Sequence, residues 1–157
     1  MTDQDKINRA IADALTAQGF EEGLTGKTQY RCNARHIMDR RSKHQECLYM
    51  HRISFDVRAA CLLPTVEVFV PHDFANPTYL IPALEEYAKR FVIFRIDTYR
   101  ARHDGQWNGF LGVDYGNSNG DHKGRETFPA RGASYCEALR NAFHAALTAE
   151  KGTAHAD

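Results

Sequence analysis

The stretch FVIFRIDTYRARHDGQWNGFLGVDY, residues 91–115, decides the fold. β-Branched and aromatic residues dominate its first part, 91–101, and that composition favours a strand. The polar sequence HDG follows at 103–105, and a second β-prone run covers 107–115. Two such runs joined by a short turn predict an antiparallel hairpin.

This hairpin is also rich in aromatic side chains. They are Phe91, Phe94, Tyr99, Trp107, Phe110 and Tyr115. Because side chains alternate between the two faces of a strand, only about half of them can face a core. The others form an exposed aromatic face, which is uncommon unless something covers it. A layer of helices, a protein partner or a second subunit would each provide that cover.

Three helices are predicted from apolar residues that recur every three or four positions. They cover residues 3–18, 78–90 and 133–149. Gly19 follows the first as a stop signal, and Thr2 or Asp3 can cap its start. In the second helix, Pro82 is tolerable if it lies in the first turn.

The remaining strands are predicted before the second helix. Residues 47–58 alternate between apolar and polar, and 66–70 form a second strand that pairs with them as a hairpin. A short strand at 29–32 is a further candidate, and 116–124 is a polar loop. The predicted order is α-β-β-α-β-β-α. The predicted fold class is therefore α+β, with an antiparallel sheet of about four to five strands flanked by helices.

Length and composition predict one globular domain over 1–151 and a flexible tail over 152–157. With 20 basic and 20 acidic residues, the chain has no global field that would attract nucleic acid or a membrane. The charged start has no apolar core of a signal peptide, and no run is long enough to span a bilayer. We expect a cytoplasmic protein whose four cysteines are free thiols or ligands.

Three segments resemble the small phage and prophage proteins that carry the phage ABA-sandwich domain. They are the opening helix INRAIADALTAQGF, the segment PTYLIPALEEYAKR, and the tryptophan-bearing strand pair followed by ASYCEALRNAFHAAL. The similarity covers residues 5–20 and 76–148, and 27–70 would be an insertion. The resemblance implies a fold and a phage context in a bacterial host. It implies no catalytic residue, because the family has none known.

A basic stretch is the first candidate binding site. Its residues are Arg31, Arg35, Arg40, Arg41, Lys43 and Arg52, with the aromatic residues Tyr30 and Tyr49 beside them. Such a cluster could neutralise phosphates while a tyrosine stacks on a base. Arginine and tyrosine are also enriched in protein–protein contacts. Since the whole chain is neutral, we expect a protein partner and keep nucleic acid as the alternative.

The same region carries ligands of the kind that zinc prefers. They are Cys32, His36, His44, Cys47 and His51, and four of these five would suffice for a tetrahedral site. The region has no Cys-x2-Cys pair, and a buried cysteine with a few polar loop residues explains the pattern equally well. We therefore expect no cofactor, with zinc as the alternative.

Support for an enzyme is weaker. Three His-Asp neighbours occur at His72-Asp73, His103-Asp104 and Asp121-His122, and a metal or catalytic cluster would need the fold to bring them together. Adjacent side chains on an extended backbone point apart, so no dipeptide forms a dyad alone. Ser134, His144 and Asp97 are the residue types of a hydrolase, but Ser134 is better placed as a helix cap and Cys136 lies on an apolar stripe.

The sequence therefore predicts a non-enzymatic accessory protein of a phage or mobile element that binds another macromolecule. Inhibition of a host defence component is one form that the resemblance suggests. A small zinc- or nucleic-acid-binding module built on residues 31–52 is the first alternative, and a metal-dependent or hydrolytic enzyme is the second. A homodimer is compatible with all three.

Overall fold

The computed structural model shows an α+β protein with two compact units, residues 1–26 with 71–157 and residues 27–70. The residues it describes are 1–32, 65–116 and 122–153. Within them, the element order is α1, α2, β1, β2, α6, β3, β4, β5, α7. The predicted fold class is confirmed, but the described strands form two antiparallel sheets of two and three strands.

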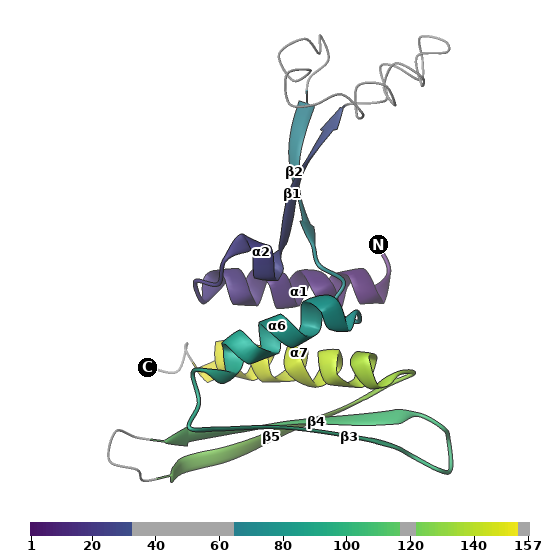
Figure 1. The fold of residues 1–157 in the computed structure, drawn as a ribbon, viewed down its shortest axis with the longest axis vertical. Coiled ribbons are helices and arrows are strands. Elements are labelled where there is room, and N and C mark those ends of the chain that lie inside the picture. Colours follow the sequence, from purple (N-terminus) through teal and green to yellow (C-terminus); the bar gives the residue numbers. More distant parts are fainter. Residues whose placement is uncertain (33–64, 117–121, 154–157) are drawn as a thin grey trace. The chain divides into compact units, whose positions relative to one another are not determined.

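The two-stranded sheet pairs β1, Gly26–Cys32, with β2, Thr65–Pro71 (Figure 1). The predicted strand over 66–70 is confirmed within β2. The candidate strand at 29–32 is also confirmed, although β1 begins three residues earlier than predicted. The strand predicted over 47–58 lies outside the described residues.

The three-stranded sheet has the order β3-β4-β5, with both pairs antiparallel. Strand β3 covers Ile93–Arg100, β4 covers Trp107–Gly116 and β5 covers His122–Gly132. The predicted hairpin is therefore confirmed. Its turn closes where the Ala101 N–H donates to the Gln106 carbonyl at 2.8 Å. Strand β5 was not predicted.

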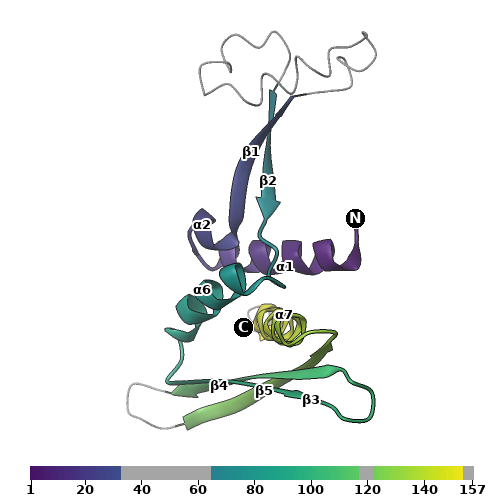
Figure 2. The ribbon, with the colours of Figure 1, turned by 45° about the vertical axis from the view of Figure 1, so that its right-hand side comes forward.

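Three longer helices belong, like the three-stranded sheet, to the unit formed by residues 1–26 and 71–157. Helix α1 covers Asp3–Ala17, α6 covers Pro77–Ala88 and α7 covers Tyr135–Thr153. A single turn, α2, Glu22–Thr25, follows α1 and was not predicted. Helix α7 packs on one face of the three-stranded sheet, and α1 and α6 pack on the opposite side of α7 (Figures 1 and 2). This unit therefore has three layers, with α7 in the middle.

The helix ends follow from local chemistry. Thr2 caps α1 by accepting from the Asp5 N–H, while the Asp5 carboxylate accepts from the Thr2 N–H, which forms a capping box. Gly19 ends the first helical segment with a φ of 85°, which favours glycine. Asn76 caps α6, because its side-chain oxygen accepts from the Thr78 N–H. Pro82, however, lies in the second turn of α6 and not in the first.

The core forms between the layers. Its largest fully buried side chains include Ile11, Leu15, Phe74, Leu80, Leu84, Tyr87, Leu111, Val113, Phe143 and Leu147. A carboxylate at the helix ends links the three long helices. Glu150 of α7 accepts hydrogen bonds from the Tyr87 hydroxyl of α6 and from the Gln18 side chain that follows α1, each at 2.7 Å. Apolar burial and this partly buried polar link together fix the helices beside the sheet.

Candidate functional site: the outer face of the three-stranded sheet

The face of the three-stranded sheet opposite α7 is the candidate site, and we call it the outer face. Alternation places Leu111 and Val113 on the α7 side, where both are buried. The cross-strand register then assigns the other set to the outer face. Among residues whose side chains the structure describes, that set is Ile93, Arg95, Asp97, Tyr99, Asn108, Phe110, Gly112, Asp114, Thr127, Pro129 and Arg131. No helix or strand from the described residues of this unit packs on this face in either view (Figures 1 and 2).

A stacked aromatic pair marks this face. The rings of Tyr99 and Phe110 lie 5.6 Å apart at an interplanar angle of 18°. Tyr99 remains 54% exposed, although its ring is held by Phe110. On the other face, Trp107 contacts Tyr135 of α7, with ring centroids 5.9 Å apart. The sequence prediction that part of the hairpin's aromatic residues stays exposed is therefore confirmed.

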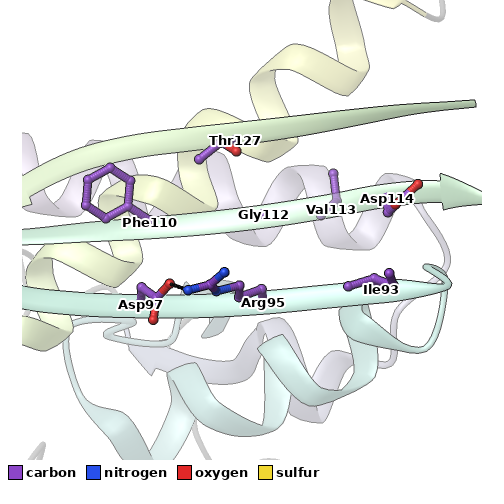
Figure 3. A pocket seen from close by; sticks show the side chains of 8 residues that line it. All are labelled: Ile93, Arg95, Asp97, Phe110, Gly112, Val113, Asp114 and Thr127. Atoms are coloured by element: carbon purple, nitrogen blue, oxygen red, sulfur yellow. Dashed lines mark ion pairs between the residues drawn. The ribbon is translucent and has the colours of Figure 1, made fainter. Parts of the chain in front are cut away.

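A shallow hollow of about 370 Å³ lies beside Phe110 of this pair (Figure 3). Gly112 lies at its centre, between Arg95 of β3 and Thr127 of β5 in the cross-strand register. Because glycine has no side chain, the middle strand leaves a gap between its two neighbours. Phe110 borders the same hollow, so an entering side chain would contact an aromatic ring.

The two arginines whose side chains are described on this face each lie close to a carboxylate. Arg95 contacts Asp97, two residues along β3, at 2.7 Å (Figure 3). Arg131 of β5 lies 3.5 Å from Asp104 in the turn between β3 and β4. Both pairs are solvent-exposed and add little to stability. Their main consequence is electrostatic, because the positive charge of each arginine is offset by the negative charge of a neighbouring carboxylate.

The turn that carries Asp104 corrects one expectation. His103 and Asp104 were expected to point apart, but their side chains meet at 3.2 Å because the backbone turns there and is not extended. Asp104 also accepts a hydrogen bond from the Gln106 N–H at 3.0 Å. That hydrogen bond is the main reason that the pKa of Asp104 lies below its ordinary value, and the nearby His103 and Arg131 charges lower the pKa further.

The binding residues predicted from sequence lie mostly outside the described part of the chain. Tyr30, Arg31 and Cys32 contribute backbone to β1. The others lie in the undescribed segment 33–64: Arg35, Arg40, Arg41, Lys43, Tyr49 and Arg52 of the basic stretch, and His36, His44, Cys47 and His51 of the zinc set. The basic site and the zinc site therefore stay predictions.

The candidate enzyme residues have other roles. The His72 ring lies 2.9 Å from the Gly23 carbonyl and stacks on Tyr79, while Asp73 accepts from Asn8 and from the Ala75 N–H. In the described residues, no three His, Cys, Asp or Glu side chains come together as a metal site needs.

The hydrolase candidates are also separated. The Ser134 hydroxyl accepts from the Glu137 N–H as a helix cap, and Cys136 is buried, both as predicted. Asp97 lies on the outer face, whereas Ser134 and His144 belong to α7 and the connection that leads into it. The sheet therefore separates Asp97 from the other two residues.

Sequence reasoning anticipated the exposed aromatic residues but missed the Arg95–Asp97 pair and the gap at Gly112. The signal was present in the alternation of residues along 93–99 and in Gly112, which lies opposite Arg95. Comparisons with protein-family models, curated proteins and solved structures find no match. None of the helices in the described ranges has both the length and the apolar character needed to cross a membrane.

Proposed function

We propose that the protein is a non-enzymatic binding module that contacts another protein through the outer face. The observation that supports this most directly is the stacked Tyr99–Phe110 pair on an exposed sheet face. A stacked ring loses little conformational freedom on binding, and aromatic side chains dominate the energetics of protein interfaces. The hollow at Gly112 gives a partner side chain a place to enter beside that pair.

The local charges favour a protein partner over nucleic acid. Nucleic-acid sites need cations that face phosphates without competition. Arg95 and Arg131, the two arginines on this face whose side chains are described, each lie against a carboxylate. A partner with apolar side chains and a few polar groups around them suits a face of this kind.

The biological setting is a further part of the proposal. The sequence resemblance to phage ABA-sandwich proteins suggests an accessory protein of a phage or mobile element. Blocking a host defence component by occupying its surface would need only binding, with no catalytic group. The outer face would then be the inhibitory surface.

A matched pair of substitutions tests the proposal. Thr127→Arg places a long charged side chain at the hollow, whereas Thr148→Arg makes the same change on an exposed part of α7. We expect affinity capture from nuclease-treated bacterial lysate to retain a specific protein with the wild type and with Thr148→Arg, and to lose it with Thr127→Arg. Capture that depends on nucleic acid, or that Thr127→Arg leaves unchanged, would contradict the proposal.

A further inference from the structure

The two edges of the three-stranded sheet differ in their capacity to add another strand. The β5 edge is blocked at two points. Pro129 has no N–H to donate, and the Arg131 carbonyl already accepts a hydrogen bond from the Asn141 side chain of α7 at 2.7 Å. Natural sheets protect their edges by such devices, because an open edge can pair with another chain.

Among the described residues, the β3 edge has no comparable protection. The Ala101 N–H donates to the Gln106 carbonyl of the facing strand end, and bonding to a neighbour alternates along antiparallel strands. The backbone N–H and C=O groups of Phe94, Ile96 and Thr98 therefore point away from β4. Strand β3 pairs with β4 alone among the described strands, so these groups lie at the open edge of the sheet, and β3 contains no proline.

Apolar side chains accompany these free backbone groups. Ile93, Ile96 and Tyr99 are 42%, 37% and 54% exposed. Ile96 lies on the α7 side of the sheet, but α7 packs mainly on β4 and β5 and leaves β3 less covered. A strand added at this edge would bury these side chains without displacing α7.

We propose that β3 pairs with β3 of a second copy of this chain, antiparallel and about a two-fold axis at Ile96. In this register Ile96 faces Ile96 of the second copy, and the outward backbone groups of both strands bond to each other. On the outer face, Arg95 faces Asp97 of the second copy and Asp97 faces its Arg95. Ile93 faces Tyr99, a pairing of aromatic and β-branched side chains that stabilises antiparallel strands.

The charges select this register over its neighbours. Sliding one copy by two residues in one direction places Arg95 against Arg95, and sliding it in the other direction places Asp97 against Asp97. Like charges directly opposite each other are destabilising. The sequence R-I-D at 95–97 is thus complementary to itself in one antiparallel register, and this complementarity identifies a second copy as the occupant of the edge.

Pairing would join the three-stranded sheets of the two copies into one sheet of six strands. Both outer faces would then lie on the same side of that sheet. A binding surface on that side would be doubled, and doubling raises the avidity for a partner that presents two sites. The pairing itself does not depend on which partner the outer face binds.

Charge reversal tests the register. Asp97→Arg places four arginines around the axis, and Arg95→Asp places four aspartates there. We expect sedimentation velocity to give twice the 17.8 kDa chain mass for the wild type and a monomer for each variant. An equimolar mixture of the two variants should form a heterodimer, because every facing pair is then opposite in charge. Glu85→Arg, an exposed change of the same sign on α6, should remain a dimer.

The exchange variant Arg95→Asp/Asp97→Arg restores complementarity within one chain and should dimerise, even if a single reversal impairs folding. A monomeric wild type would overturn the proposal. So would reversal variants that still dimerise alone, or an exchange variant that stays monomeric. None of these outcomes bears on the Thr127→Arg experiment, which tests the outer face separately.

Discussion

The backbone of Ala138 in α7 lies so close to Gly109 of β4 that a Cβ at residue 109 would come within 2.6 Å of the Ala138 carbonyl carbon. A Cβ at Gly132 of β5 would come within 2.5 Å of the Ala138 nitrogen. Both neighbours are backbone atoms of a packed helix, which cannot move aside alone. The layer between α7 and the sheet therefore depends on two glycines.

Gly109→Ala and Gly132→Ala should each destabilise the fold, by about 1–3 kcal/mol or more, because overpacking forces the helix away from the sheet. Gly112→Ala is the matched control, since its Cβ would meet nothing nearer than 3.8 Å. Urea unfolding should show a lower free energy of unfolding for Gly109→Ala and Gly132→Ala. For Gly112→Ala it should show no loss of stability, or a gain of up to about 1 kcal/mol. Equal stability of all three variants would contradict this packing.

Much of this layer was predictable from sequence, and its missing parts have physical reasons. The apolar stripe of α7 and the β-prone run at 93–100 predicted a helix on a hairpin. Strand β5 was missed because Pro129 and Gly132 are typical of turns. In the structure Pro129 is tolerated because β5 is an edge strand, and Gly132 is required by the approach of Ala138.

The candidate site was predictable only in part. Alternation predicted that some aromatic residues stay exposed, but not that Tyr99 and Phe110 would stack, since this depends on the register between β3 and β4. The pairing of β2 with β1 was also missed, because the strand predicted over 47–58 is closer to β2 in the sequence and was expected to be its partner. The spacing of residues along a chain does not specify which strand becomes the neighbour.

Asn8→Ala should cost about 1–3 kcal/mol, because the Asn8 side chain is the acceptor for the buried Phe74 N–H and would leave that donor without a partner. It also donates to the Asp73 carboxylate at 3.2 Å. Gln4→Ala, an exposed change on the same helix, should stay within about 0.5 kcal/mol of the wild type. Thermal unfolding of the two variants measures the difference, and similar melting temperatures would contradict the assigned role of Asn8.

The β3–β4 turn should weaken in acid. The pKa of Asp104 is lowered in the folded state, so its carboxylate stabilises the turn above the ordinary aspartate pKa, and this stabilisation is lost as the pH falls through the lowered value. An NMR titration should find the Asp104 midpoint below the ordinary aspartate value of about 3.9. Arg131→Ala should raise that midpoint. A midpoint at or above the ordinary value would show that the Gln106 hydrogen bond does not form in solution.

Protein purified without a histidine tag should contain no stoichiometric zinc. The Cys32, His36, His44, Cys47 and His51 set has the right ligand types but no Cys-x2-Cys pair. Elemental analysis measures the zinc content directly. About one zinc per chain, lost on changing Cys32 and Cys47 to Ser, would replace this expectation with the metal-binding alternative.

The most direct test of the proposed function is site-specific photo-crosslinking from the two threonines compared above. A photoreactive residue is placed at Thr127 on the outer face or at Thr148 on α7, and the cells are irradiated before lysis. The account predicts that Thr127 yields a protein adduct that Thr148 does not, and that its mass gain is that of a partner other than this chain. Adducts from Thr148 alone, or crosslinks from Thr127 to nucleic acid, would contradict the assignment of the outer face as a protein-binding surface.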